Sequence, residues 1–151
     1  MAASRILKSA QQFFDRREQL HARALADSER QAGESEARLA ELEHYRAMYL
    51  RDFDQRARHG MTADEVRTYQ AFLARIALAL EEQQKLVERA RAQHAEELRK
   101  WRSAARRSVA VNRIVDRRVL ADRRHTEKSA QATADAHAQR SWASKGKSHG
   151  R

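Results

Sequence analysis

The sequence contains no proline and only four glycines in 151 residues, and aromatic residues make up 6% of it. Proline and glycine are the residues that most often interrupt helices, so their scarcity predicts long helices. Alanine supplies much of the apolar fraction, and it favours helix while burying little area. We therefore expect an elongated all-α coiled coil rather than a thick globular core.

The chain also lacks cysteine and any long apolar run. Without cysteine it can form neither a disulfide framework nor a thiolate metal cluster. The first residues include Arg5 and Lys8 but no continuous apolar stretch of the kind that a signal peptide has, and no later segment is apolar enough to span a membrane. We therefore expect a soluble protein, and the absence of cysteine is compatible with a reducing cytosol.

A turn is indicated near Gly60, because glycine can adopt the left-handed conformation that ends many helices. Thr62 and Glu65 have the three-residue spacing of a capping box, in which each side chain accepts a hydrogen bond from the other residue's backbone N–H. Met61 and Val66 occupy the two positions of a hydrophobic staple around that cap. These residues predict that one helix ends just before the turn and that a second begins just after it.

Apolar residues recur every three or four positions on both sides of this turn. Before it the repeat consists of Ile6, Ala10, Phe13, Leu20 and Ala24, and then of Ala32, Leu39, Leu42, Tyr49 and Phe53. After it the repeat consists of Tyr69, Leu73, Ile76, Leu80, Gln83, Val87, Ala90, His94, Leu98, Trp101, Ala105, Val109, Asn112, Val115 and Val119. This spacing is typical of coiled-coil core positions. A weaker stretch over residues 27–35, with small and polar side chains, predicts a stutter or a local loosening.

Two long helices that each have an apolar stripe and are joined by a short turn must pack antiparallel, because otherwise both stripes would stay exposed. With the turn between residues 60 and 61, residues at one level have numbers that add to about 121, so the first helix reaches the level of about residue 118. The second helix loses its apolar repeat after Val119 and Leu120, where its partner runs out.

These observations predict a two-helix antiparallel coiled coil over residues 1–125. Its helices are expected at about 3–58 and 63–125, with the turn at about 59–62. Residues 126–151 are mainly small and polar, so we expect them to form a disordered, flexible basic tail.

A second apolar stripe runs beside the core positions near the turn. In the predicted register, four pairs of residues stand at matching levels: Tyr49 with Phe72, Tyr45 with Ile76, Leu42 with Ala79, and Arg38 with Gln83. These residues either broaden the coiled-coil core or form a surface that a partner covers. Two helices cannot cover so wide an apolar band, so we expect part of it to remain exposed and to bind a partner protein.

The positive charge is concentrated between Arg99 and Arg124, where ten basic residues stand against Asp116 and Asp122. Such a stretch attracts an acidic protein surface, nucleic acid or anionic lipid, and its charge alone does not distinguish them. No recognisable nucleic-acid docking motif accompanies the arginines, and bulky interfacial apolar residues are lacking, which disfavours the latter two partners. We favour an acidic protein surface, contacted by Arg99, Arg102, Arg106, Arg107, Arg113, Arg117 and Arg118.

Residues that could support catalysis or metal binding are few. Glu41 and His44 have the Glu-x-x-His spacing of di-iron proteins, but those sites need four helices around the metals. His94 stands at a core position, where a hydrogen-bonded histidine is more common than a metal ligand. The sequence has no Gly-rich phosphate loop, nucleophile elbow or zinc motif, and a two-helix protein is expected to lack a concave pocket. We expect no enzymatic activity, no cofactor and no small-molecule substrate.

A set of residues around the turn is recognisable as a group. It consists of Glu43, His44, Tyr45, Arg46 and Tyr49, the Gly60 turn, and Thr68, Tyr69, Gln70, Ala71, Phe72, Ile76, Gln83 and Gln84. This set resembles the FliJ family of the bacterial flagellar type III export apparatus. The resemblance lies mainly in residues 36–90, and outside them it rests on length, helicity and basic character.

The resemblance implies a protein similar to the central stalk of rotary ATPases, with its terminal half in the pore of the hexameric export ATPase and its turn-proximal half at the export gate. It also implies binding to the cytoplasmic domain of the gate protein, escort of export chaperones, and a place at the cytoplasmic face of the inner membrane. The positions that match the family's gate-binding surface are Leu42, Tyr45, Tyr49, Phe72, Ile76, Ala79 and Gln83. Arg38 departs from the glutamine expected at its position. The alternative reading of the residues is a basic coiled coil associated with nucleic acid or the ribosome.

Overall fold

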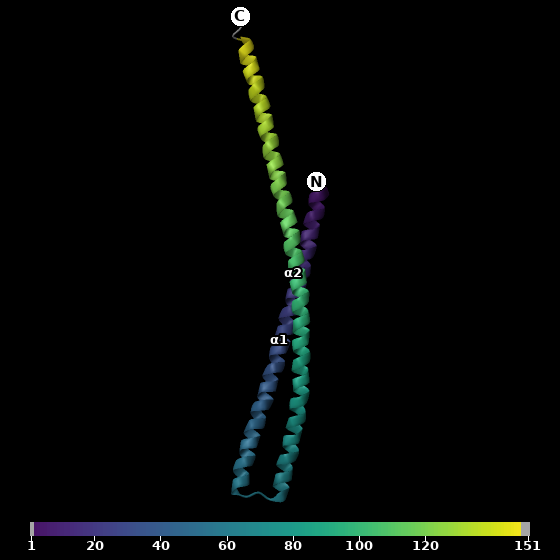
Figure 1. The fold of residues 1–151 in the computed structure, drawn as a ribbon, viewed down its shortest axis with the longest axis vertical. Coiled ribbons are helices and arrows are strands. Elements are labelled where there is room, and N and C mark those ends of the chain that lie inside the picture. The colour runs from purple at the N-terminus through teal and green to yellow at the C-terminus, as the bar shows by residue number, and fades with distance from the viewer. Residues whose placement is uncertain (1, 149–151) are drawn as a thin grey trace. The chain divides into compact units, whose positions relative to one another are not determined.

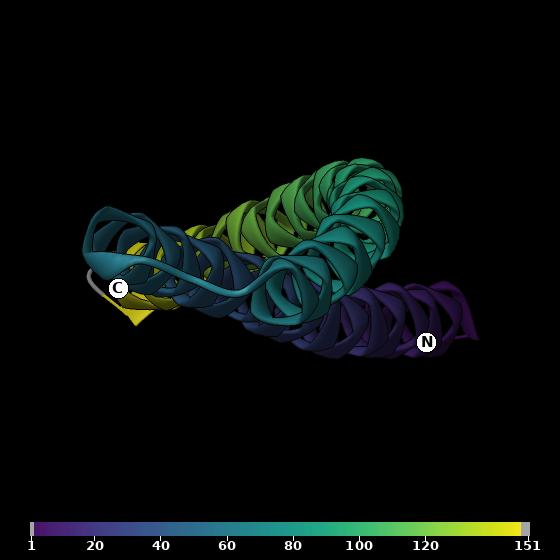
Figure 2. The ribbon, with the colours of Figure 1, turned by 90° about the horizontal axis from the view of Figure 1, so that it is seen from below.

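Two long α-helices make up the regular structure of the described residues. The computed structural model describes residues 2–148, in which helix α1 spans Ala2–His59 and helix α2 spans Ala63–Ser148. Figure 1 shows the two helices joined by one short connection, which Figure 2 shows from its own end. The predicted fold class, an all-α antiparallel helical hairpin, is confirmed.

The chain divides into two compact units, and each contains a piece of both helices. One consists of residues 1–16 and 105–151 and is named the terminal unit. The other consists of residues 17–104, includes the connection between the helices, and is named the turn unit.

The turn has the backbone geometry that its residues predict. Gly60 has a φ of 95°, which side chains with a Cβ rarely adopt, and its N–H donates to the Ala57 carbonyl oxygen at 3.4 Å. After the turn, Thr62 Oγ1 accepts a hydrogen bond from the Glu65 N–H at 3.2 Å, and the Thr62 carbonyl oxygen accepts one from the Val66 N–H at 3.1 Å. Thr62 is therefore the N-cap of α2, as predicted.

The core of the turn unit lies mainly along one side of α2. Ile76, Leu80 and Val87 are buried there, and Val87 is only 3% exposed. The buried residues of α1 are Ser28 and Ala32. Small side chains let the axes of two packed helices come close together, which is how such short residues become covered.

Ser28 and Ala32 lie inside the stretch where the sequence predicted a stutter or a local loosening. The structure shows no loosening there, because α1 is helical throughout residues 27–35 and its most buried side chains are in this stretch. Ser28 Oγ donates a hydrogen bond to the Leu25 carbonyl oxygen at 2.8 Å, so the buried hydroxyl has a partner within its own helix.

Polar side chains also join the two helices within each unit. In the terminal unit, Gln11 Nε2 donates to Asn112 Oδ1 at 2.6 Å, and Ser108 Oγ donates to Asp15 Oδ1 at 2.6 Å. These pairs agree, within one helical turn of about 3.6 residues, with the register predicted from the turn.

In the turn unit, Trp101 Nε1 donates to Glu18 Oε1 at 2.9 Å, and Arg91 Nε lies 2.8 Å from Glu36 Oε1. The indole N–H of Trp101 therefore has a partner on the opposite helix, and this end of the turn unit follows the same antiparallel pairing as the turn itself.

Helix α2 continues beyond its predicted end near residue 125. Residues 126–148, which the sequence assigned to a disordered tail, are helical, and residues 149–151 lie outside the described residues. Alanine recurs through this segment and proline is absent from it, so local propensity favours continuing the helix. Its side chains are exposed apart from a half-buried Ala136, and Trp142 is 82% exposed.

Candidate functional site

Five aromatic residues near the turn form a continuous cluster. This aromatic cluster consists of Tyr45, Tyr49 and Phe53 of α1 and Tyr69 and Phe72 of α2. Phe72 stacks on Tyr49 with ring centroids 4.3 Å apart, which confirms that these residues stand opposite each other. The Tyr69 ring is 5.4 Å from Tyr49 and 5.5 Å from Phe53, and Tyr45 is 6.2 Å from Phe72. Ring pairs at such distances contribute about 0.5–1.5 kcal/mol beyond their buried area, so the cluster helps to hold the two helices together.

A polar group fixes the orientation of Tyr69 in this cluster. Its hydroxyl donates to Asp52 Oδ2 at 2.5 Å. Arg56 lies 5.8 Å from the Tyr69 ring centroid, and its Nε is 3.5 Å from the same carboxylate oxygen. The hydrogen bond to Asp52, followed by desolvation, raises the pKa of Tyr69 above its ordinary value of 10.0, because both favour the neutral phenol.

The seven positions predicted to bind the export gate all lie in the turn unit, but they differ in exposure. Tyr45 is 46% exposed. Ile76 and Gln83 are buried, and Gln83 Nε2 donates to the Ser35 carbonyl oxygen at 3.0 Å. The remaining four positions are half-buried, namely Leu42, Tyr49, Phe72 and Ala79. A partner can therefore reach Tyr45 most directly, whereas Ile76 and Gln83 belong to the interface between the helices.

A shallow cleft of about 580 Å³ opens beside the aromatic cluster. Tyr49, Asp52 and Arg56 line it from α1, and Tyr69, Phe72 and Arg75 line it from α2. The expectation that a two-helix protein has no concave surface is therefore wrong, because side chains of unequal size leave an open groove between the helices. The cleft presents aromatic rings together with two guanidinium groups, which suits an amphipathic or acidic segment of a partner.

The group formed by Asp52, Arg56 and Tyr69 was not predicted from the sequence. One signal for it was available, because Asp52 and Tyr69 stand at matching levels in the predicted register. The contact of Arg56 with the Tyr69 ring could not be read from the register, since it depends on the side-chain conformation of a long, flexible residue.

The predicted basic residues are exposed and fall into both units. Arg99 and Arg102 belong to the turn unit, and Arg99 Nη2 lies 2.7 Å from Glu96 Oε1. Their hydrogen bond lowers the pKa of Glu96 and raises that of Arg99. The other predicted residues belong to the terminal unit, namely Arg106, Arg107, Arg113, Arg117 and Arg118. Of these five, only Arg118 has an ion-pair partner among residues 2–148, with its Nε 4.0 Å from Asp122 Oδ1.

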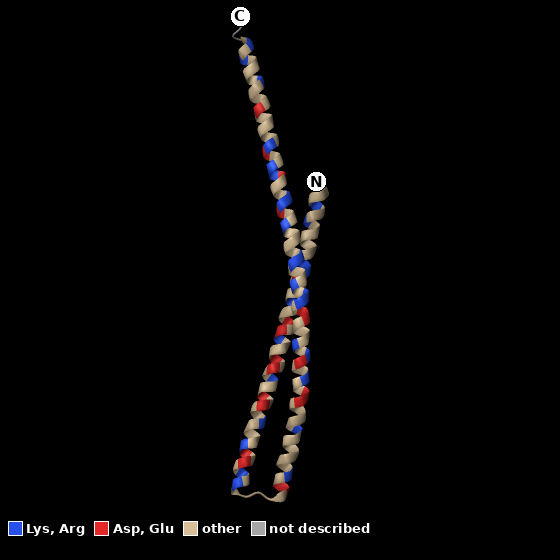
Figure 3. Ribbon diagram, viewed as in Figure 1, with Lys and Arg blue, Asp and Glu red and all other residues tan. Residues whose placement is uncertain are grey.

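The terminal unit carries the whole net charge of the chain. It contains fifteen Lys and Arg residues against five Asp and Glu residues, whereas the turn unit contains sixteen of each. Its surplus of ten therefore equals the formal net charge of +10. Figure 3 shows the closely spaced Lys and Arg residues in the middle part of α2, and mixed signs on both helices nearer the turn. Attraction of an anionic partner is consequently concentrated in the terminal unit.

Residues 2–148 contain neither a metal-ligand cluster nor a membrane-spanning helix. Within them, no three His, Cys, Asp or Glu side chains come together as metal ligands, and Glu41 and His44 are exposed. Neither helix, over the same residues, has a stretch that combines the length and the apolarity needed to cross a bilayer.

Comparison with protein families finds a match over most of the chain. The family described as "Flagellar FliJ protein" matches residues 4–147. Comparison with curated proteins and with solved structures finds no significant match. The family match therefore extends well beyond residues 36–90, where the resemblance around the turn mainly lies.

Proposed function

Because the chain belongs to the FliJ family and is thereby a protein of flagellar export, we propose that it is a non-catalytic coupler between the export ATPase and the export gate. In this proposal the turn unit binds the cytoplasmic domain of the gate protein, and the terminal unit contacts the hexameric ATPase as a central stalk does. The protein works in the cytoplasm, at the cytoplasmic face of the inner membrane. Its escort of export chaperones rests on the family resemblance.

The aromatic cluster carries the part of the proposal that concerns the gate. Three of its five residues, Tyr45, Tyr49 and Phe72, are at positions that match the family's gate-binding surface, and Tyr45 is 46% exposed. Tyr49 and Phe72 hold the surface in shape through their stacked rings, 4.3 Å apart. Partly exposed aromatic residues on a rigid support are the residue type most often found at the centres of protein interfaces. Ile76 and Gln83 contribute by fixing the two helices beneath the surface.

The charge of the terminal unit supports the proposed contact with the ATPase. A stalk that turns or rocks inside a ring needs attraction that does not depend on one fixed set of contacts. A surplus of ten positive charges spread over exposed arginines supplies such a long-range attraction toward an acidic surface.

Calorimetric titration with the purified cytoplasmic domain of the gate protein tests the proposal. Tyr45→Ala should weaken binding by about 2 kcal/mol, which is roughly 30-fold in Kd. Phe72→Ala should weaken it by a similar factor, because it removes the ring on which Tyr49 stacks. Leu78→Ala is the matched control, since Leu78 is apolar, 62% exposed and in the same unit.

Helicity of each variant is compared by circular dichroism, so that loss of binding can be separated from loss of fold. If Tyr45→Ala and Phe72→Ala bind as tightly as the wild type, the aromatic cluster is not the gate surface. If all three variants lose binding equally, the contact is not specific to the cluster.

Stimulation of the export ATPase tests the second contact. Arg106→Glu combined with Arg117→Glu should reduce the stimulation, because the pair reverses two exposed charges of the terminal unit. Arg23→Glu combined with Arg89→Glu makes the same change in net charge within the turn unit and should leave the stimulation near its wild-type level. Equal effects of the two double variants would contradict a contact made by the terminal unit.

A further inference from the structure

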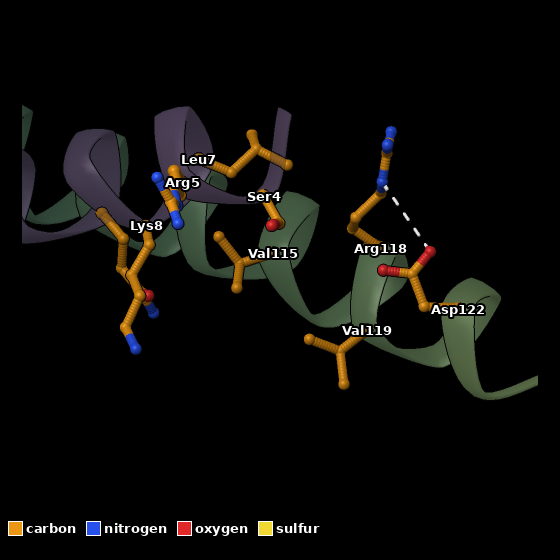
Figure 4. Close-up of a pocket in the computed structure, with 9 residues that line it drawn as sticks. Ser4, Arg5, Leu7, Lys8, Val115, Arg118, Val119 and Asp122 are labelled. Carbon is orange, nitrogen blue, oxygen red and sulfur yellow. Dashed lines mark ion pairs between the residues drawn. The ribbon is translucent and has the colours of Figure 1, made fainter. Parts of the chain in front are cut away.

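A second cleft lies in the terminal unit, away from the aromatic cluster along the sequence. Its volume is about 470 Å³. Figure 4 shows its walls, with Arg5, Leu7 and Lys8 contributed by α1 and Val115, Arg118 and Val119 by α2. We name it the terminal cleft. Its residues are distinct from those of the candidate gate surface.

Apolar side chains from both helices line the terminal cleft. Val115 and Val119 are one helical turn apart and therefore project from the same side of α2, while Leu7 lines the cleft from α1. The two helices leave these side chains incompletely covered, since Val119 is 46% exposed. The terminal cleft thus offers an apolar surface that a third element could bury, and removing that surface from water favours binding.

Positive charges surround this apolar surface. Arg5 and Lys8 stand on the α1 wall, and Arg118 stands on the α2 wall. Asp122 is the acidic residue among those lining the terminal cleft, and it lies 4.0 Å from Arg118, at the limit of an ion pair. The cleft also belongs to the unit with the surplus of ten positive charges. A ligand that complements it is apolar on one side and acidic along its edges.

We propose that the terminal cleft binds an acidic amphipathic α-helix of a partner protein. The apolar face of that helix packs on Leu7, Val115 and Val119, and its Asp and Glu residues pair with Arg5, Lys8 and Arg118. The inference goes beyond the proposed function, because it defines a docking surface and the chemistry of its ligand without reference to the gate or to the pore of the ATPase.

The ligand is a helix for a physical reason. The backbone groups of α1 and α2 are hydrogen-bonded within each helix, so an extended segment finds no free edge with which to pair. A helix satisfies its own backbone and packs its side-chain ridges into the groove between two others. A second copy of this chain is disfavoured, because each copy carries a formal charge of +10. Nucleic acid is disfavoured because no aromatic ring lines the terminal cleft to stack on a base.

A labelled peptide is the direct probe. It consists of several heptads with leucine at the core positions and glutamate at the flanking positions, and fluorescence anisotropy follows its binding to the full-length chain. One comparison peptide has lysine in place of every glutamate, and another has serine in place of every leucine. The acidic amphipathic peptide should bind at least tenfold more tightly than either of them. If the serine peptide binds equally well, the apolar surface plays no part and the proposal fails.

Variants of the chain locate the contact. Val119→Glu places a charge on the apolar wall, at a position exposed enough to tolerate it, and should weaken binding at least tenfold. Arg5→Glu combined with Lys8→Glu should weaken binding to a similar extent and should improve binding of the lysine peptide. Lys128→Glu combined with Arg140→Glu is the control, since it makes the same change in net charge within the terminal unit but outside the cleft. It should change the affinity by less than twofold.

Three outcomes would overturn the proposal. Equal weakening by the two double variants would mean that general charge attraction accounts for the binding. Unchanged binding by Val119→Glu, in a chain whose helicity is normal, would mean that the peptide lies elsewhere. Binding of anionic phospholipid vesicles that displaces the peptide and is weakened by Val119→Glu would identify the terminal cleft as a lipid-binding surface instead.

Discussion

Replacing Gly33 or Gly60 by alanine should change the free energy of unfolding in opposite directions. Gly33 lies inside α1, and a Cβ added there meets no atom within 4 Å, so Gly33→Ala should stabilise the chain by about 1 kcal/mol through helix propensity. Gly60 also has open space around it, but its φ of 95° is strained for any other residue. That strain costs about 1–2 kcal/mol, and the reduced freedom of the unfolded chain offsets about 0.4–1 kcal/mol of it. Gly60→Ala should therefore destabilise the chain by about 0.8 kcal/mol, the middle of a range of roughly 0–1.6 kcal/mol.

Urea unfolding followed by far-ultraviolet circular dichroism measures both effects. The midpoints should move in opposite directions while the slope with urea stays constant, because neither substitution changes the surface exposed on unfolding. Gly60→Asn is a useful control, since asparagine tolerates the left-handed region better than alanine. If Gly33→Ala were less stable than the wild type, regular helix at that position would be refuted. If Gly60→Ala were as stable as the wild type, the positive φ would not be needed for the turn.

Three other predictions concern the core, the polar group at Tyr69 and the end of α2. In urea unfolding, Val87→Ala should lower the free energy of unfolding by about 2 kcal/mol because Val87 is buried. Leu78→Ala should change that free energy by less than about 0.5 kcal/mol, because Leu78 is exposed. In an absorbance titration, Tyr69 should ionise above its ordinary pKa of 10.0, and Asp52→Ala should lower that pKa by removing the hydrogen-bond acceptor. A pKa that is raised on folding stabilises the folded chain at pH values below the unfolded pKa. The stability that the Tyr69 contact contributes should therefore be lost as the pH rises through the folded pKa of Tyr69. An unchanged titration of Tyr69 in Asp52→Ala would refute the contact. Removal of residues 126–151 should reduce the helical signal but leave the urea midpoint unchanged, because the described part of this segment is almost entirely exposed.

The turn and the register could be predicted because each depends on a few strong local rules. Gly60 and Thr62 mark the helix boundaries through backbone geometry and capping, which do not depend on the rest of the chain. Once the turn is placed, the constant rise of an α-helix fixes which residues stand opposite each other. The stacking of Phe72 on Tyr49 is a direct consequence of that arithmetic.

Two features of α1 and α2 could not be predicted in this way. Ser28 and Ala32 look like a weak core because leucine is the usual core residue, yet small side chains become buried when the helices approach each other closely. The helical state of residues 126–148 was missed because the prediction relied on an apolar repeat, whereas alanine-rich sequence favours helix without one.

The candidate site was predicted in its position and less well in its details. The seven residues assigned to the gate surface do lie in one region, but periodicity could not show that Ile76 and Gln83 are covered while Tyr45 is not. Exposure depends on how far each side chain stands from the line of closest approach of the helices, and that distance follows from packing rather than from spacing along the sequence. The terminal cleft escaped prediction for the same reason.

The two polar pairs in the terminal unit have a consequence for slippage of one helix along the other. A shift by one heptad would keep most apolar positions in contact. It would also bring Asp15 to the level of Val115, so that the hydrogen bond between the Ser108 hydroxyl and the Asp15 carboxylate would be lost. Each stranded polar group costs about 1–3 kcal/mol, and more when it is charged. The hydrogen bond between Gln11 and Asn112 would be lost in the same shift. Leucine at these positions would remove this penalty and leave the short turn as the remaining constraint on the alignment of the two helices.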